Sequence, residues 1–182
     1  MWVLNIRRHL KLALFAAGIK SLEESIEIRE VTVNDEFAIL EIRNHPENFK
    51  WFLNDSSVSI DEHSEWFKSR LDKSKFFTLI AESKDEILGI AYLSDPTVYS
   101  PRVSISIKPG SKGKGVGSSL LKELIRRSKS VNLESLSAEI KGGNCSSISL
   151  FSRSGFVMNH LESEIQEVRA FGVLRLILNL NS

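Results

Sequence analysis

The chain has 182 residues, about the length of one domain, so one hydrophobic core and one functional site are expected. A hydrophobic content of 42% excludes a disordered chain. The near balance of 24 Lys and Arg against 23 Asp and Glu excludes a general attraction to nucleic acid or to an anionic membrane. The single cysteine, Cys145, excludes an internal disulfide, and the four histidines lack metal-ligand spacing, so a cytoplasmic protein without a metal is expected.

Residues 1–25 are predicted to form a helical extension, separate from a domain over residues 26–182. Arg7, Arg8 and Lys11 precede an apolar run over 12–19, superficially like a signal peptide. That run is well short of the roughly 20 residues needed to span a bilayer, so stable membrane insertion is not expected. We interpret the segment as an amphipathic helix covering the domain or the neighbouring subunit of a homodimer; a membrane-surface helix and a misassigned start site are the alternatives.

The next elements are a strand, two helices and a hairpin. Alternating residues predict a strand over Ile26–Arg29, and Asn34 or Asp35 can cap a helix that ends near Asn44, because Pro46 disfavours helical geometry before it. Ser59 and Glu62 have capping-box spacing and predict a second helix. The strands expected over 77–81 and 87–93 are joined too closely for anything but an antiparallel hairpin.

The second half starts with a strand over Val103–Lys108, stopped by Pro109-Gly110. An amphipathic helix follows through residues 120–127, then a strand over 136–140, a short helix over 147–152 with Gly155 as its left-handed cap, and a strand-like tail over 168–180. Together these elements predict an α+β sandwich: one mixed, mainly antiparallel sheet of six or seven strands, flanked by helices.

A glycine-rich turn between the strand ending at Lys108 and the next helix is the most informative segment. It reads Lys112-Gly113-Lys114-Gly115-Val116-Gly117-Ser118. Glycines let the backbone approach a ligand closely, and the unpaired N–H groups at a helix start attract anions. Two lysines add positive charge, so the turn is predicted to bind a pyrophosphate.

Spacing decides between the known phosphate loops. A Walker A loop needs lysine directly after its second glycine, but Val116 follows Gly115. The dinucleotide fingerprint would place glycine at position 118, which is serine, and an antiparallel hairpin precedes the turn where a βαβ unit is required. Both loops are therefore excluded.

The turn resembles motif A of the GNAT N-acetyltransferase superfamily, R/Q-x-x-G-x-G/A. A second family motif is similar to the segment from Asn144 to Phe156, and the resemblance covers roughly residues 26–178. It implies acetyl-CoA as acyl donor and no metal. It also implies contacts to the donor from three places: the strand residues Ile105, Ser106 and Ile107, the turn from Lys112 to Ser118, and the later residues Asn144, Ser147 and Phe151.

Two positions depart from the family pattern. Lys112 replaces the arginine or glutamine, which keeps a cation and loses a planar fork. Phe151 stands where the family's tyrosine commonly protonates the departing thiolate. Tyr92, Tyr99, a serine or water could substitute, or the thiolate could leave unaided; a catalytically silent CoA-binding module is the alternative.

The acceptor region resembles that of N-acetyltransferases acting on nucleotide-linked amino sugars in pseudaminic-acid-type pathways. The matching residues are Arg43, Asn44 and His45, then His63 after the capping box. Arg43 and the histidines could contact a diphosphate, with Trp51 and Phe52 available for stacking. The resemblance implies a sugar-nucleotide acceptor; acetylation of a protein N-terminus, as by ribosomal-protein acetyltransferases, is the alternative.

The expected mechanism is direct attack of a neutral amine on the thioester in a ternary complex. Backbone N–H groups of residues 103–107 would polarise the carbonyl. Glu139, His63, Ser106 with its neighbour Ser104, or a water between them would take the proton. Cys145 is expected to be structural, because no histidine lies near it in sequence.

Overall fold

The computed structural model describes residues 25–54, 56–72, 77–94, 100–159 and 172–181. The predicted N-terminal helix, Tyr99 and the first residues of the tail lie outside these ranges. The elements in chain order are β1 (Glu27–Glu30), η1 (Val33–Asp35), α2 (Glu36–Asn44), α3 (Pro46–Phe49), α4 (Ile60–Arg70), β2 (Thr78–Ser83), β3 (Glu86–Leu93), β4 (Val103–Ile107), α5 (Val116–Ser130), β5 (Ser135–Lys141), α6 (Cys145–Arg153), β6 (Val157–Met158) and β7 (Val173–Asn179).

The predicted α+β class is confirmed, but the strands form two sheets instead of one. The first is antiparallel in the order β1-β2-β3-β4, and the second has the order β5-β7-β6. The short elements α3 and β6 were not predicted. The capping box of Ser59 and Glu62 is present at the start of α4, and Gly155 has the left-handed conformation expected after α6 (φ 92°).

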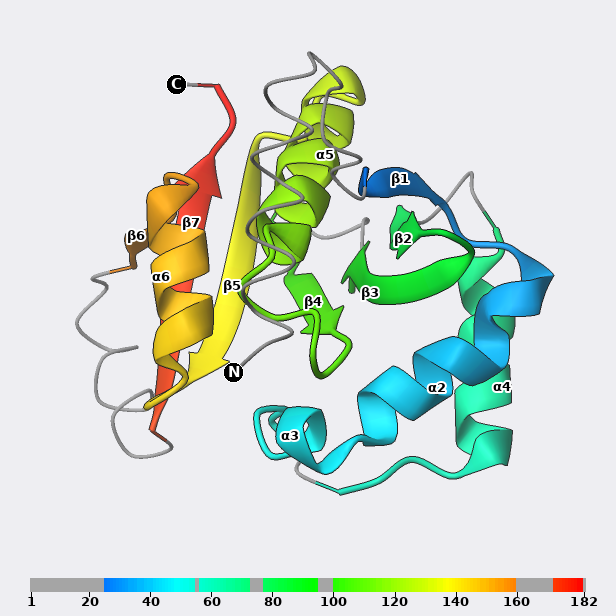
Figure 1. The fold of residues 1–182 in the computed structure, drawn as a ribbon. Helices are drawn as coiled ribbons and strands as arrows, with labels where there is room; N and C mark the ends of the chain where they lie inside the picture. The colour runs from blue at the N-terminus through cyan, green and yellow to red at the C-terminus, as the bar shows by residue number, and fades with distance from the viewer. Residues whose placement is uncertain (1–24, 55, 73–76, 95–99, 160–171, 182) are drawn as a thin grey trace, which may run out of the picture.

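The first sheet has a helical layer on each face (Figure 1). On one face Leu79, Ala91 and Leu93 pack against α5, whose Leu120, Leu121 and Leu124 are fully buried. On the other face Ile80 and Ile90 pack against Ile39 of α2 and Phe67 of α4. Strand alternation explains this division, because successive side chains of β2 and β3 point to opposite faces.

Two hydrogen-bonded ion pairs fasten the edge strand β1. Arg29 binds Asp35 of η1 through two hydrogen bonds of 2.7 and 2.8 Å, and its Nε donates to Glu82 of β2 at 2.8 Å. Asp35 also accepts from the Thr32 N–H at 2.7 Å. Burial alone would raise the pKa of Asp35, but the hydrogen bonds from Arg29 and Thr32 hold it below its usual value.

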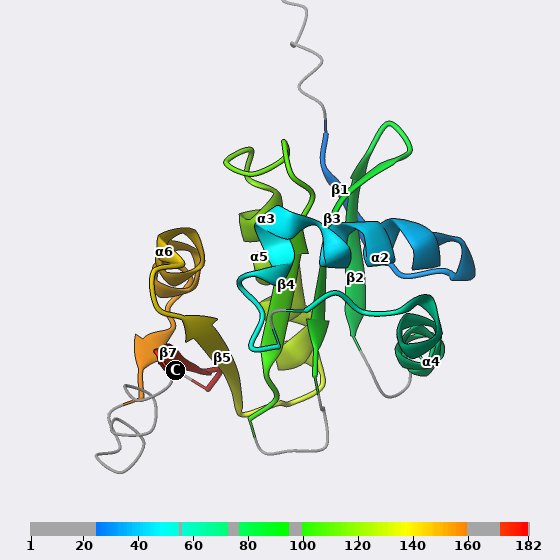
Figure 2. The same ribbon diagram turned by 90° about the horizontal axis from the view of Figure 1, so that it is seen from below.

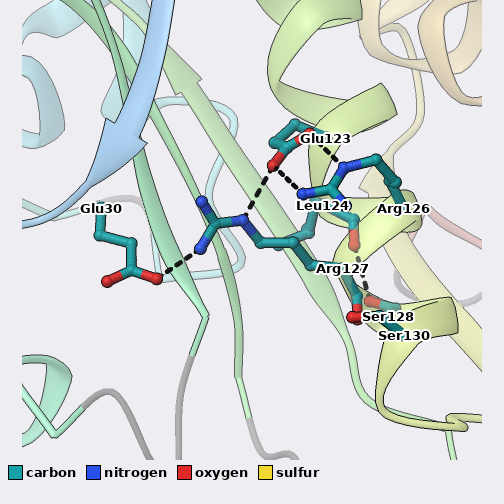
Figure 3. Close-up of polar contacts among 7 residues, drawn as sticks. All are labelled: Glu30, Glu123, Leu124, Arg126, Arg127, Ser128 and Ser130. Atoms are coloured by element: carbon teal, nitrogen blue, oxygen red, sulfur yellow. Dashed lines mark hydrogen bonds and ion pairs between the residues drawn. The ribbon is translucent and has the colours of Figure 1, made fainter.

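A second network joins β1 to α5 (Figure 3). Glu123 accepts hydrogen bonds from Arg126 at 2.7 and 2.8 Å and from Arg127 at 2.9 Å, and Arg127 also pairs with Glu30. These contacts, above all those from Arg126, lower the pKa of Glu123 from 4.5 to about 2. The folded state therefore favours the ionised carboxylate more strongly than the unfolded chain does.

We expect Glu123→Gln to reduce the acid sensitivity of the fold. A depressed folded-state pKa contributes stability that is fully present above pH 4.5 and is lost as the pH falls towards about 2. Glutamine cannot titrate, so the free energy of unfolding should fall less steeply across that window, measured by urea denaturation at several pH values. Glu65→Gln, on the exposed face of α4, is the matched control. Equal slopes in wild type and Glu123→Gln would contradict the assignment.

Candidate functional site

Strands β4 and β5 meet at one end and separate at the other (Figure 2). A single parallel bridge pairs Arg102 with Ser137, and the Ser137 N–H donates to the Pro101 carbonyl at 2.9 Å. Beyond it the two described strands form no ladder, since β4 pairs with β3 and β5 with β7. The free side of β4 is therefore directed towards the place where the two sheets part.

The register of β4 shows which backbone groups lie on that side. The Ser94 N–H donates to the Arg102 carbonyl and the Lys108 N–H donates to the Leu88 carbonyl, each at 2.8 Å. Antiparallel strands alternate the direction of these groups, so even-numbered residues of β4 bond to β3 and odd-numbered residues face β5. The Ile107 carbonyl accepts from Asn48 Nδ2 at 3.0 Å. Ile105 is thus the central residue whose N–H and carbonyl face the parted stretch.

The N-terminus of α5 follows directly after β4 and has the features of an anion site. Its N-cap is Gly115, in a left-handed conformation (φ 86°), with no side-chain cap and no acidic residue in the first turn. The N–H groups of Val116, Gly117 and Ser118 therefore lack the usual capping partner. The space where a Cβ of Gly113 or Gly115 would stand is open, so a ligand could approach the backbone there.

Helix α6 packs beside this turn. A Cβ on Gly117 would lie 3.1 Å from Leu150 Cδ2, so the glycine allows the two helices to approach closely. Asn144 is the N-cap of α6, and its Oδ1 accepts from the Ser147 N–H at 3.2 Å. Phe151 is 4% exposed and meets Phe156 edge to face at 5.0 Å. The position of the family's tyrosine is therefore a core position here.

The short helix α3 connects the turn, β4 and β5. Asn48 is buried and donates to the carbonyls of Ile42 and Ile107, at 2.8 and 3.0 Å. Glu47 pairs with Lys112 of the turn at 3.3 Å, and Lys141 Nζ at the end of β5 donates to the Lys50 carbonyl at 3.3 Å. Helix α3 was not predicted, although proline directly after a capping residue is a helix-start signal.

The four residues predicted to bind the acetyl acceptor differ in how many of their polar groups are already hydrogen-bonded within the chain. Asn44 bonds to the Val58 backbone with both ends of its amide, and His45 caps α3 through Nδ1. His63 is buried, its Nε2 lies 3.0 Å from the Glu36 carbonyl, and burial lowers its pKa, so the ring is neutral and Nε2 carries the proton. Of the four, Arg43 has the most capacity left for a ligand.

The predicted proton acceptors also differ. Both carboxylate oxygens of Glu139 accept from arginines, one from Arg102 and the other from Arg175 at 3.1 Å. Both oxygens are thus engaged in fastening β5 to its neighbours, which favours a structural role for Glu139 over a role as the base. Ser106 is opposite Ile90, and Ser104 is opposite Tyr92, so both hydroxyls lie on the sheet face that α2 and α4 cover.

Comparisons with known proteins identify the family of the chain. The profile of the acetyltransferase (GNAT) domain family matches residues 25–157, most of the chain. The chain belongs to this family. It is an acetyltransferase that uses acetyl-CoA as its donor. In the described residues no helix is long and apolar enough to cross a membrane, and no group of three or more His, Cys, Asp or Glu could hold a metal ion.

Individual relatives show similarity over most of the chain. An L-methionine sulfoximine/L-methionine sulfone acetyltransferase from Pseudomonas aeruginosa is 30% identical over 138 residues, which are 72% of this chain and 80% of that protein. The L-amino acid N-acyltransferase MnaT from Escherichia coli is 28% identical, over 73% and 80% of the two chains. The structure of YncA from Salmonella typhimurium with its cofactor acetyl-CoA superposes with a TM-score of 0.70 at 25% identity, covering 85% and 94%.

Ser118→Glu should weaken acetyl-CoA binding without loss of stability. An acid at the third position of a helix is favourable for the helix, but it repels a pyrophosphate at the same N–H groups. We expect the Kd for CoA, measured by calorimetry, to rise roughly tenfold or more. Ser152→Glu, which adds the same charge at an exposed position of α6, should leave it unchanged. Unchanged affinity in a folded Ser118→Glu variant would contradict the anion site.

Proposed function

We propose that this protein transfers the acetyl group of acetyl-CoA to the amino group of a free amino acid or a close analogue. The observation that carries the transfer is the Ile105 backbone edge of β4, directed into the parted stretch in front of the uncapped α5 N-terminus. The choice of acceptor is supported by the relatives, which are named for methionine sulfoximine, methionine sulfone and L-amino acids. A reaction in the cytoplasm fits the single, unpaired cysteine.

The chain's own groups suit a direct transfer. Val116, Gly117 and Ser118 would hold the pyrophosphate with their N–H groups, and Lys112 and Lys114 would add positive charge. The Ile105 N–H would polarise the thioester carbonyl while the neutral amine attacks its carbon, so that a C–N bond forms and the C–S bond breaks. Proximity in the ternary complex then supplies much of the rate enhancement.

The reaction releases one proton, which the attacking nitrogen loses to solvent water, and the sulfur departs as the thiolate. Ser106, alone or through a water shared with Ser104, is our candidate for relaying the proton released from the amine, because both hydroxyls lie on the acceptor face of β4. Phe151 has no proton to give, and a thiol with a pKa of about 8.5 is a good enough leaving group to depart as the thiolate. The buried, neutral His63 would act by holding α4 against α2.

A nucleotide-linked amino sugar is the second candidate acceptor. The observation that favours it is Arg43, a cation able to meet a diphosphate as well as a carboxylate. A full diphosphate site made of Arg43, Asn44, His45 and His63 has less support. The polar groups of Asn44 and His63 are already hydrogen-bonded to the backbones of Val58 and Glu36. A peptide N-terminus is the remaining alternative acceptor.

An acceptor panel tests the proposal. The protein is incubated with acetyl-CoA and, separately, with L-methionine sulfoximine, L-amino acids, nucleotide-linked amino sugars and N-terminal peptides, and free thiol release is followed. We expect turnover with at least one amino acid or analogue and much less with the other two classes. Turnover of nucleotide-linked sugars or peptides alone would replace the proposal, and no turnover with any amino acid or analogue would overturn it.

Cys145→Ala should retain most of the turnover with the best acceptor of that panel. Cys145 is an exposed free thiol, and the proposed transfer passes through no acetylated side chain. Steady-state kinetics and mass spectrometry of the wild type with acetyl-CoA alone provide the test. Stoichiometric acetylation of Cys145, released when acceptor is added, would establish a covalent route instead.

A further inference from the structure

Arg43 differs from the other half-buried arginines of the fold. It ends α2, where its guanidinium lies 3.8 Å above the centroid of the Phe52 ring and its Nη2 donates to the Asn54 carbonyl at 3.2 Å. Its Nη1 is shielded from solvent and has no hydrogen-bond partner among the described residues. Arg29 and Arg127, by contrast, each bind two carboxylates.

The surroundings of Arg43 suit its guanidinium to bind an anion. Burial lowers the pKa of Arg43, yet a guanidinium stays protonated in proteins, so its positive charge persists. A buried charge without a counter-ion is unfavourable, and an unsatisfied buried donor adds a further cost. Phe52 and the Asn54 carbonyl orient the group, and a carboxylate from outside the chain would satisfy both its charge and Nη1.

The position of Arg43 is on the acceptor side of β4. Helix α2 packs over β3 and β4, and Tyr92 of β3 lies within electrostatic reach of Arg43, where it partly offsets the lowering of the Arg43 pKa by burial. Tyr92 is opposite Ser104, and the next pair along the ladder is Ile90 and Ser106. Arg43 therefore lies over the face that carries the two serine hydroxyls, which flank Ile105 in sequence.

We infer that Arg43 binds the carboxylate of the acceptor and so selects amino acids over simple amines. The inference rests on the proposed function and adds the residue and the chemical group that determine specificity. The Arg43 cation, oriented by the Phe52 ring, and the two serine hydroxyls would together hold the carboxylate at one end of the acceptor. The amino group at the other end would then be directed towards the Ile105 edge. Arg43 is a substrate-binding residue that takes no part in proton transfer.

A matched pair of acceptors tests the inference. The best amino acid of the panel is compared with its carboxamide, which keeps the amine and the side chain but has no negative charge. Replacing Arg43 by glutamine should raise the KM for the amino acid roughly tenfold to hundredfold, the effect of losing a charge-assisted contact. The KM for the carboxamide should change less than about twofold, and the KM for acetyl-CoA should be unaffected.

Two further variants separate binding from structure. Arg43→Lys keeps the charge without the planar fork, so it should recover part of the preference for the acid. Arg153→Gln removes an equal charge from the exposed end of α6 and should change none of the constants. If the KM values for the amino acid and the carboxamide rise equally in Arg43→Gln, or if the KM for acetyl-CoA rises, Arg43 acts by supporting the structure of residues 52–54. Either result would overturn the inference.

The wild type distinguishes this failure from failure of the proposed function. If it acetylates amino acids and their carboxamides equally well, the function stands and the role of Arg43 is wrong. If it acetylates only nucleotide-linked sugars, with a KM that rises in Arg43→Gln, the bound anion is a diphosphate, and both the function and the carboxylate assignment are overturned.

Discussion

The backbone hydrogen bonds of β4 are the constraint on which the site depends. One edge of the strand is satisfied by β3, so the groups of its odd-numbered residues must find partners elsewhere. β5 supplies them at the Arg102 end only, and Asn48 supplies one at Ile107. The edge at Ile105 lies between these two anchors, and this is where we propose that the thioester takes the place of a neighbouring strand. In the proposed site, the division into two sheets is thus the structural condition for binding the donor.

Helix α3 connects the donor side of the proposed site to its acceptor side. It is only four residues long, yet its Asn48 fastens the end of β4 to the last turn of α2, the helix that carries Arg43. A buried amide left without such partners would cost about 1–3 kcal/mol, so this register of α3 is strongly preferred. Glu47 reaches Lys112 from the same helix, so the phosphate turn and the acceptor helix share a support.

The half-buried arginines that hold the strands together differ from Arg43 in their partners. Arg29 and Arg127 hold β1 against β2, η1 and α5, and Arg102 and Arg175 hold Glu139 between β4, β5 and β7. In each case the guanidinium charge is balanced by a carboxylate of the chain. Arg43 has an aromatic ring and a carbonyl instead, which orient a cation without neutralising it. That contrast makes it the candidate for an external anion.

The sequence by itself determined the features that depend on neighbouring residues. These are the capping box of α4, the β2–β3 hairpin, the end of α2 before Pro46 and the glycine turn with its left-handed Gly113 and Gly115. Such signals are local, because backbone geometry and capping need only a few adjacent residues. The family motifs depend on the same short spacings, so the family and its acetyl-CoA donor were predictable as well.

Only the tertiary structure decided which polar side chains were left for chemistry. Glu139 was predicted as a candidate base, but its two carboxylate oxygens accept hydrogen bonds from Arg102 and Arg175, each more than 30 residues away in sequence. Asn48, unnoticed in the sequence, finds its partner 59 residues along the chain. The hydrogen-bond partners of a polar side chain depend on which groups lie near it in the folded chain. Contacts between distant segments produce no periodic pattern in a single sequence, so they cannot be predicted from it.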